Sequence, residues 1–306
     1  MTKLPTVVMT YNIFPEIVHS KLKPNAKVVI AKTRSELKKA LIRADALISL
    51  LSDSIDKELL DYGRNLRVVG NYAVGVDNID LRECRKRGIA VVNTPGVLTR
   101  ATAELALTLL LAVARRVPEG EKLCRNNLFK GWKPDLSLGQ ELKNRHALIV
   151  GKGRIGKETA KLFKAIGLRV DWITKADGRK QTALKLRKTQ ILSLHVPLTK
   201  NTKHWLDKQK ISLLPKDAIV INTSRGSVID EKALIAALES RKIFGAGLDV
   251  FENEPVIPLR LRRLNNVVLL PHIGSATFKT RKAMADLVIC GILSVLRGKR
   301  PLNLVQ

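Results

Sequence analysis

Several kinds of residue are scarce in this chain, and each shortage excludes a class of protein. Only three of the 306 residues are cysteine, and their scattered positions match neither a metal-binding spacing nor a disulfide framework. The longest apolar run, from Leu105 to Val113, contains one Thr and is too short to span a bilayer. The first residues include no apolar segment of signal-peptide length. We therefore expect a protein of the reducing cytoplasm without a membrane segment.

Acidic residues are also scarce relative to basic ones. The chain has 55 Lys and Arg against 27 Asp and Glu, which gives a formal net charge of +28. Such a charge attracts nucleic acids and anionic metabolites. However, the basic residues are spread through almost every segment, and only three Trp, three Tyr and six Phe are present to stack bases. A generally cationic surface is the favoured interpretation, and nucleic acid is not an expected partner.

The order of apolar segments predicts two α/β domains. The first 94 residues alternate short β-branched runs with helical patterns, which indicates a parallel sheet covered on both faces. A helix is expected at 35–44, opened by a capping box from Thr33 to Glu36. The strands of this block are expected at 6–9, 27–31, 46–50, 66–70 and 89–92.

A second alternating block follows the turn-forming residues 93–96. It opens with a helix at 101–117 that Pro118 is expected to stop, and a polar loop at 125–139 comes next. A last amphipathic helix is expected at 276–296. The remaining predicted strands are 147–150, 169–173, 191–195, 218–221, 245–249 and 267–270, with helices at 156–166 and 231–240.

The sharpest local signal is a glycine-rich turn, Gly151-Lys152-Gly153-Arg154-Ile155-Gly156, between a strand and a helix. Gly151 is expected to make the tight turn, Gly153 to let a pyrophosphate approach the backbone, and Gly156 to let the helix pack on the strand. The unpaired N–H groups of the helix N-terminus then attract phosphate. This arrangement predicts a dinucleotide-binding site.

The end of the next strand indicates which dinucleotide binds. An NAD site usually has an acidic residue there to bond the ribose, but Asp171 lies in mid-strand. Thr174 holds the strand-end position, with Lys175 beside it and Arg179-Lys180 nearby. A hydroxyl and several cations can bind a 2′-phosphate, whereas a carboxylate would repel it. We predict NADP(H) over NAD(H); a cationic loop without this role is the alternative.

Three chemically useful side chains follow strands of the second block. Arg225, Glu254 and His272 each lie near a predicted strand end, which is where ligands bind in open α/β sheets. Singly, a His or Arg at a strand end usually satisfies local carbonyls. Together the three supply the groups that reduction of a 2-keto acid needs.

At this point the chain resembles the D-isomer-specific 2-hydroxyacid dehydrogenases. Phe129-Lys130-Gly131-Trp132 is similar to their glyoxylate/hydroxypyruvate reductase branch. The motifs that carry the resemblance are the glycine turn, Asn-Thr-Ser-Arg-Gly at 222–226, Gly-Leu-Asp-Val-Phe-Glu-Asn-Glu-Pro at 247–255, Pro-His-Ile-Gly-Ser-Ala at 271–276, and segments 71–80 and 93–99.

The resemblance implies a role for each site residue. His272 would be the general acid, Glu254 would orient its imidazole, and Arg225 would bind the substrate carboxylate and polarise the carbonyl. Backbone N–H groups around Val74 and Gly75 would complete the carboxylate site. The implied coenzyme-binding residues are Gly151, Gly153, Arg154, Ile155, Gly156, Thr174, Lys175, Val196, Pro197, Thr223, Asp249 and Gly274, with Asp249 near the carboxamide.

The resemblance also implies an architecture. A Rossmann coenzyme domain, 95–273, would be inserted into a flavodoxin-like substrate domain, 1–94 plus 274–306, and the cleft between them would close on the substrate. Relatives are commonly dimers with the helix beginning near Ala101 at the interface. One departure stands out: between Ile173 and Ile191 the chain has room for only one short helix, about 181–189. We therefore expect the edge strand of the coenzyme sheet to be missing.

Two other functions stay open at this stage. A related dehydrogenase for a larger or phosphorylated acid, such as phosphoglycerate, would have the same motifs. The C-terminal-binding-protein corepressors share the fold and the catalytic trio but act as nucleotide-sensing scaffolds, although no peptide-binding extension is visible here.

Overall fold

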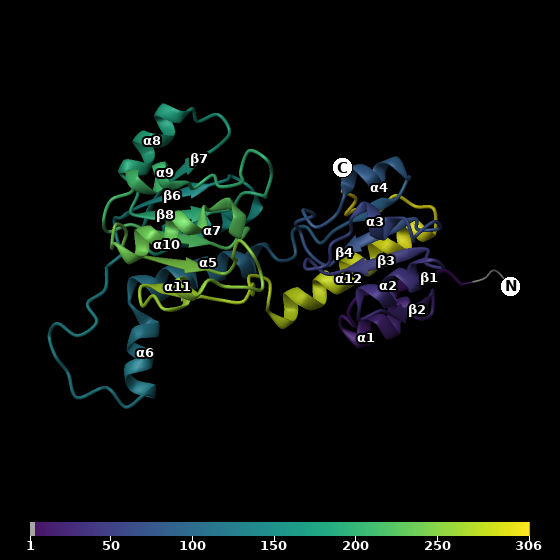
Figure 1. The fold of residues 1–306 in the computed structure, drawn as a ribbon, viewed down its shortest axis with the longest axis horizontal. Coiled ribbons are helices and arrows are strands. Elements are labelled where there is room, and N and C mark those ends of the chain that lie inside the picture. Colours follow the sequence, from purple (N-terminus) through teal and green to yellow (C-terminus); the bar gives the residue numbers. More distant parts are fainter. Residues whose placement is uncertain (1–3, 306) are drawn as a thin grey trace. The chain divides into compact units, whose positions relative to one another are not determined.

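The computed structural model describes residues 4–305, and the chain divides into two compact units. Unit 1 contains the described residues up to Leu98 together with those from Ala276 onward, and unit 2 contains Thr99–Ser275. Every strand pair in both sheets is parallel, and helices cover the sheets (Figure 1). The predicted fold class, two α/β domains with parallel sheets, is confirmed.

Unit 1 has a five-stranded sheet in the order β2-β1-β3-β4-β5, the flavodoxin-like order. Its central strands β3 and β4 are buried at every position, because helices cover both faces of a parallel sheet. The strands are β1 (Thr6–Met9), β2 (Lys27–Ile30), β3 (Ala46–Ser49), β4 (Val68–Asn71) and β5 (Ala90–Val92). The helices are α1 (Pro15–Ile17), the π-helix η1 (Val18–Leu22), α2 (Arg34–Leu41), α3 (Lys57–Leu60), α4 (Leu81–Lys86) and α12 (Phe278–Leu296).

The long C-terminal helix α12 packs on β4 of unit 1. A glycine permits this close packing, since a Cβ at Gly70 would lie 2.7 Å from Ile292 Cδ1 and from Val288 Cγ2. The helix begins two residues later than the sequence suggested, because the side chain of Thr277 caps its first turn by accepting from Thr280 N–H. Figure 1 shows this helix, in yellow, lying along the sheet of unit 1.

Unit 2 has a six-stranded sheet in the order β11-β10-β9-β8-β6-β7. The strand order reverses at β6, which pairs with β7 on one side and β8 on the other. The strands are β6 (His146–Val150), β7 (Arg169–Ile173), β8 (Ile191–Leu194), β9 (Ile219–Asn222), β10 (Gly245–Leu248) and β11 (Val267–Leu269). The helices are α5 (Thr99–Ala114), α6 (Val117–Arg125), α7 (Arg154–Ala165), α8 (Arg179–Arg187), α9 (Lys208–Leu213), the 3-10 helix η2 (Gly226–Val228), α10 (Glu231–Glu239) and α11 (Leu259–Arg262).

The expected loss of an edge strand is confirmed, because β7 ends the sheet among the described residues. A Rossmann sheet normally continues past this position with one more strand. A single helix, α8, occupies the segment instead, two residues earlier than the predicted range 181–189. Gly178 serves as the N-cap of α8.

The prediction that Pro118 stops a helix at 101–117 is wrong. Helix α5 ends at Ala114, the chain turns at Arg116 in the left-handed region (φ +53°), and Pro118 lies in the first turn of α6. Proline fits there because its missing N–H is one that a first turn leaves unpaired. Helix α7 likewise begins at Arg154, two residues before the predicted start, because Gly153 serves as its N-cap.

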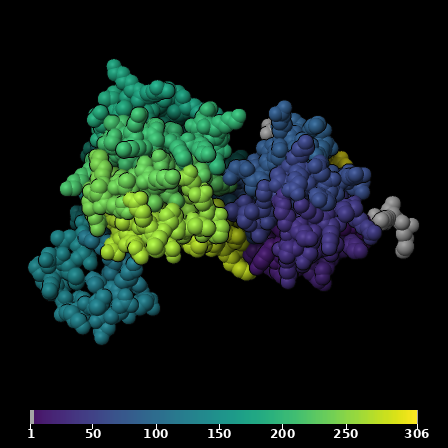
Figure 2. Space-filling view, viewed as in Figure 1, coloured from purple at the N-terminus to yellow at the C-terminus, as the bar shows by residue number. Residues whose placement is uncertain are grey.

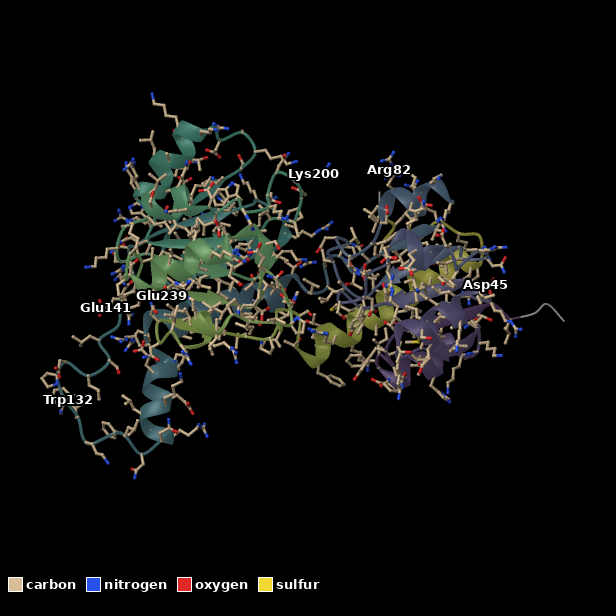
Figure 3. All side chains as sticks on the ribbon, viewed as in Figure 1. Asp45, Arg82, Trp132, Glu141, Lys200 and Glu239 are labelled. Carbon is tan, nitrogen blue, oxygen red and sulfur yellow. The ribbon has the colours of Figure 1, made fainter. Side chains whose placement is uncertain are left out.

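Helix α6 and residues 126–139 form a segment that we call the arm. The arm extends from the rest of unit 2 (Figure 2), and α6 contains no buried residue. Its exposed apolar side chains are Val117, Leu128, Phe129, Trp132, Leu136 and Leu138. Trp132, labelled in Figure 3, is 81% exposed. No helix within residues 4–305 is both long and apolar enough to cross a membrane.

Candidate coenzyme and catalytic site

The glycine turn at the end of β6 has the backbone that each glycine was predicted to need. Gly151 has φ +102°, which side chains rarely adopt. A Cβ at Gly156 would lie 2.1 Å from the carbonyl oxygen of Gly151, so only glycine lets α7 approach the strand. A Cβ at Gly153 would meet nothing within 4 Å, so space is open beside its backbone. Gly153 leaves the N–H groups of α7 without a side-chain cap.

These features fit a dinucleotide at the point where the strand order of the sheet reverses. Open α/β sheets bind nucleotides outside the carboxyl ends of the strands at such a point. An uncapped helix of 12 residues presents its positive end to phosphate there. One polar atom supports the same location: the Thr223 hydroxyl is buried without any hydrogen-bond partner at the end of β9. A buried hydroxyl of this kind is costly unless a ligand bonds it.

The neighbouring strand end holds a histidine that sequence reasoning missed. His195 follows β8, and its carbonyl oxygen would lie 2.4 Å from a Cβ at Gly151, so it packs directly on the glycine turn. Its Nε2 atom lies 2.8 Å from the hydroxyl of Ser193. Burial lowers the pKa of His195 to about 3, so the imidazole is neutral. Val196 also packs against the glycine turn. The resemblance implied Val196 and Pro197 as coenzyme-binding residues but did not include the neighbouring His195.

The end of β7 is less available to a ligand than the sequence suggested. The predicted ligand Thr174 donates its hydroxyl to Asp177 Oδ2 (3.1 Å), and its N–H donates to the same oxygen (2.9 Å). Lys185 Nζ donates to Asp177 Oδ1 at 2.8 Å. Lys175, Arg179 and Lys180 remain exposed beside this turn. The cations can therefore still meet a phosphate, whereas the hydroxyl proton of Thr174 is already committed.

His272 and Glu254 form a hydrogen-bonded pair in unit 2. His272 Nδ1 lies 2.9 Å from Glu254 Oε2, and Phe251 N–H donates to Glu254 Oε1 (3.0 Å). Burial favours a raised pKa for Glu254, but its hydrogen bond with His272 and the charges of His272 and Arg225 outweigh burial and lower the pKa. The carboxylate is therefore ionised.

Asp249 organises the backbone around this pair. Its two carboxylate oxygens accept from Ile273 N–H and Gly274 N–H, each at 2.7 Å, and its carbonyl oxygen accepts from His272 N–H at 2.9 Å. His272 itself has φ +56°, a left-handed conformation that these bonds hold. Burial raises the pKa of Asp249 to about 6, although the two N–H donors favour the ionised form. These contacts show what Asp249 does within the protein; its predicted place near a carboxamide stays a prediction.

Arg225 lies on a loop that packs against the loop carrying Glu254. Asn222, the last residue of β9, donates from Nδ2 to the Arg225 carbonyl oxygen (2.9 Å) and accepts from Ser224 through Oδ1. A Cβ at Gly226 would lie 1.8 Å from the carbonyl carbon of Phe251, so glycine is required where the two loops touch. Beside the hydrogen bond with His272, the positive charge of Arg225 contributes to the lowered pKa of the Glu254 carboxyl.

Val74 and Gly75, the predicted carboxylate-binding residues, belong to unit 1. Asn93 Nδ2 donates to the Val74 carbonyl oxygen, and Asn71 Nδ2 donates to the Gly75 carbonyl oxygen, each at 2.7 Å. Within the described residues no hydrogen bond uses the N–H group of Val74 or Gly75. The loop after β4 is therefore fixed through its carbonyls, and its N–H groups are available as donors.

No metal site is evident in the part of the chain that the structure describes. Residues 4–305 contain no group of three or more His, Cys, Asp or Glu side chains placed to hold a metal ion. The pair of His272 and Glu254, the guanidinium of Arg225 and the glycine turn are thus the features of unit 2 that offer acid–base chemistry, anion binding and dinucleotide binding.

Comparisons with known proteins agree on one family. Residues 107–274 match the model of the NAD binding domain of D-isomer specific 2-hydroxyacid dehydrogenases. The chain is 45% identical over 290 residues to the glyoxylate reductase of Thermococcus litoralis, covering 90% of this chain and 88% of that protein. It is 40% identical over 323 residues to the glyoxylate reductase of Pyrococcus horikoshii, covering 99% and 96%.

Solved structures give the same result. A protein of Thermus thermophilus superposes with a TM-score of 0.93 at 39% identity, covering 98% of this chain and 100% of that chain. The NADPH-dependent glyoxylate/hydroxypyruvate reductase of Sinorhizobium meliloti, solved in complex with NADP and malonate, superposes with a TM-score of 0.90 at 31% identity. That match covers 98% of this chain and 96% of the other.

Proposed function

This chain belongs to the D-isomer-specific 2-hydroxyacid dehydrogenase family, and from that premise we propose that it reduces glyoxylate or hydroxypyruvate to the D-2-hydroxy acid in the cytoplasm. The observation that carries the proposal is the hydrogen bond between His272 and Glu254, in the same unit as Arg225 and the glycine turn. Relatives described as glyoxylate reductases support a small 2-keto acid as the substrate.

His272 is the proposed general acid. A bound nicotinamide coenzyme supplies the hydride that reduces the keto carbon, and the keto oxygen then needs a proton. Because Nδ1 of His272 is bonded to Glu254, the proton available for transfer is on Nε2. The ionised Glu254 accepts a hydrogen bond from Nδ1 and keeps the imidazole ring in one orientation.

Arg225 is the proposed anchor for the substrate. Its guanidinium offers a planar set of donors that can bind a carboxylate and also polarise the adjacent keto oxygen. The packing of the Arg225 loop against the loop that carries Glu254 supports this role, since a Cβ at Gly226 would lie 1.8 Å from the carbonyl carbon of Phe251. The N–H groups of Val74 and Gly75 are the proposed donors to the same carboxylate.

The proposed coenzyme is NADP(H), with NAD(H) as the alternative. The N–H groups at the start of α7, including those of Arg154 and Ile155, are the proposed ligands of the pyrophosphate. The Thr223 hydroxyl, Asp249, Gly274 and the Val196-Pro197 segment are proposed to line the nicotinamide half. The exposed cations Lys175, Arg179 and Lys180 support a 2′-phosphate, and the complex of NADP with the Sinorhizobium reductase is consistent with it.

We also propose a homodimer in which the arm contacts a second copy of this chain. The arm exposes Phe129 and Trp132 together with several aliphatic side chains, and such a surface is unfavourable in water. Helix α5, predicted at the interface, buries eight of its residues but exposes Leu111, so it is proposed to contribute to the same contact.

A panel of 2-keto acids assayed with NADPH and NADH tests the proposal. We expect turnover of glyoxylate and hydroxypyruvate and little turnover of 3-phosphohydroxypyruvate. Turnover of 3-phosphohydroxypyruvate alone would show that the phosphorylated acid is the substrate in place of glyoxylate or hydroxypyruvate. Coenzyme binding without turnover of any acid would favour the nucleotide-sensing scaffold instead.

A further inference from the structure

The open edge of the unit 2 sheet is closed by side chains in place of the missing strand. The carbonyl oxygen of Ile173 points toward the β6 side of the strand and accepts a hydrogen bond from Gly151 N–H (3.0 Å). Neighbouring residues of a strand direct their polar groups to opposite sides, so those of Trp172 point to the open edge. Both are occupied: Trp172 N–H donates to Asp171 Oδ1 (2.7 Å), and Lys185 Nζ donates to the Trp172 carbonyl oxygen (2.6 Å).

Lys185 connects this edge to the turn that follows β7. The same Nζ atom lies 2.8 Å from Asp177 Oδ1 and 3.8 Å from Asp171 Oδ1. Asp177 Oδ2 accepts from the N–H and the hydroxyl of Thr174. One ammonium group on α8 therefore holds the strand edge, the carboxylate of Asp177 and, through it, Thr174.

The location of this network gives it a consequence for the ligand. Thr174 directly follows Ile173, whose carbonyl is bonded to Gly151, so the turn 174–177 begins beside the glycine turn. In a Rossmann unit the adenosine ribose is recognised at this strand end, where a carboxylate selects the 2′-hydroxyl and opposes a 2′-phosphate. The side chain of Asp177 is only 12% exposed, and its hydrogen bond with Lys185 lowers the pKa of the Asp177 carboxyl.

We infer that the Lys185–Asp177 pair sets the coenzyme preference, an inference that rests on the proposed dehydrogenase function. Lys185 neutralises the carboxylate and turns it inward, which leaves Lys175, Arg179 and Lys180 to determine the local charge. Without Lys185, Asp177 is an uncompensated anion beside the 2′ position and selects against NADPH. The preference thus depends on a helix that replaced an edge strand and on a residue far from the strand end in sequence. Lys185 and Asp177 act as positioning residues.

Four variants test the inference: Lys185→Met, Asp177→Asn, the double variant, and Lys188→Met. The dissociation constants of NADPH and NADH are measured by fluorescence titration, together with the melting temperature. We expect Lys185→Met to weaken NADPH binding about tenfold and to change NADH binding less than about twofold, as one uncompensated charge near a phosphate predicts. Adding Asp177→Asn should restore NADPH binding. Lys188 is exposed at the same end of the helix, so Lys188→Met removes an equal charge and serves as the matched control.

The outcomes separate this inference from the proposed function. If Lys185→Met lost affinity for NADPH and NADH equally, and Asp177→Asn did not restore it, Lys185 would only support the fold. That result would overturn the inference. If Lys188→Met lost the same affinity for NADPH, the change would follow from net charge alone, and the inference would be overturned as well. Failure of the unaltered protein to bind either coenzyme would instead refute the proposed function.

Discussion

His272 Nδ1 lies 2.9 Å from Glu254 Oε2, although the two residues are 18 positions apart in the chain. The end of β10 joins them, because Asp249 accepts from the backbone of His272 while Phe251, two residues on, donates to the other oxygen of Glu254. An imidazole held in this way has one nitrogen committed to the carboxylate and the other available for proton transfer.

Replacing His272 by Ala should abolish most turnover and leave coenzyme binding intact. A positioned general acid contributes about 10²–10⁴-fold to rate, so we expect kcat to fall by that factor. The dissociation constant of the coenzyme should change less than about twofold. Steady-state kinetics and fluorescence titration measure the two quantities. His19→Ala, at an exposed position, is the control; retained activity in His272→Ala would remove the residue from this role.

Glu254→Gln should shift the pH dependence of kcat/KM. The carboxylate has a lowered pKa and stays ionised near neutrality, and its negative charge is proposed to stabilise the positive charge of a proton-donating imidazole. A neutral amide does not, so the loss of activity with rising pH should begin at lower pH in the variant. The pH profile of kcat/KM measures the shift. Glu239→Gln, which removes a carboxylate from an exposed ion pair, should leave the profile unchanged; an unchanged profile in Glu254→Gln would contradict the proposal.

Arg225→Ala should raise KM for the keto acid and lower kcat together. The guanidinium is proposed to bind the carboxylate in the ground state and to polarise the carbonyl in the transition state, so kcat/KM should fall by about 10²–10³-fold or more. Arg225→Lys keeps the charge but not the paired donors, and we expect it to recover only a small part of the activity. Full activity in the Lys variant would show that charge alone is sufficient.

Gly226→Ala should disrupt the site by separating two loops. The added Cβ would lie 1.8 Å from the backbone of Phe251, so the Arg225 loop must move away from the Glu254 loop. We expect a melting temperature lower by several degrees and a large loss of kcat/KM. Gly120→Ala is the matched control, because a Cβ there meets nothing within 4 Å and Ala favours the helix α6. Equal behaviour of the two variants would refute this account of the loops.

Thr223→Val should weaken coenzyme binding without destabilising the protein. The hydroxyl of Thr223 is buried with no partner in the unliganded chain, so its removal should leave the melting temperature unchanged or raise it. If the coenzyme bonds this hydroxyl, the loss of one hydrogen bond of about 1 kcal/mol raises the dissociation constant about fivefold. Differential scanning fluorimetry and coenzyme titration measure both effects. Unchanged affinity would place the ligand elsewhere.

The sequence predicted the elements of the fold well where packing follows a simple pattern. Most of the buried parallel strands are short apolar runs, and every predicted strand was found within two residues of its expected position. The boundary at Pro118 was wrong, because proline is equally compatible with the end of one helix and the first turn of the next. Which of the two occurs depends on the turn at Arg116, and no local signal predicts that turn.

The sequence by itself determined which groups are proposed for the site, because the glycine turn and the motifs around Arg225, Glu254 and His272 can be recognised from residue type and spacing. Only the tertiary structure decided which side chains remain available to a ligand. Thr174 is at the predicted strand end, but its hydroxyl is bonded to Asp177, and Asp177 is bonded to Lys185 on a helix. Such contacts depend on how a helix packs beside an open sheet edge, and this packing is set by the three-dimensional arrangement of the chain and not by residue spacing.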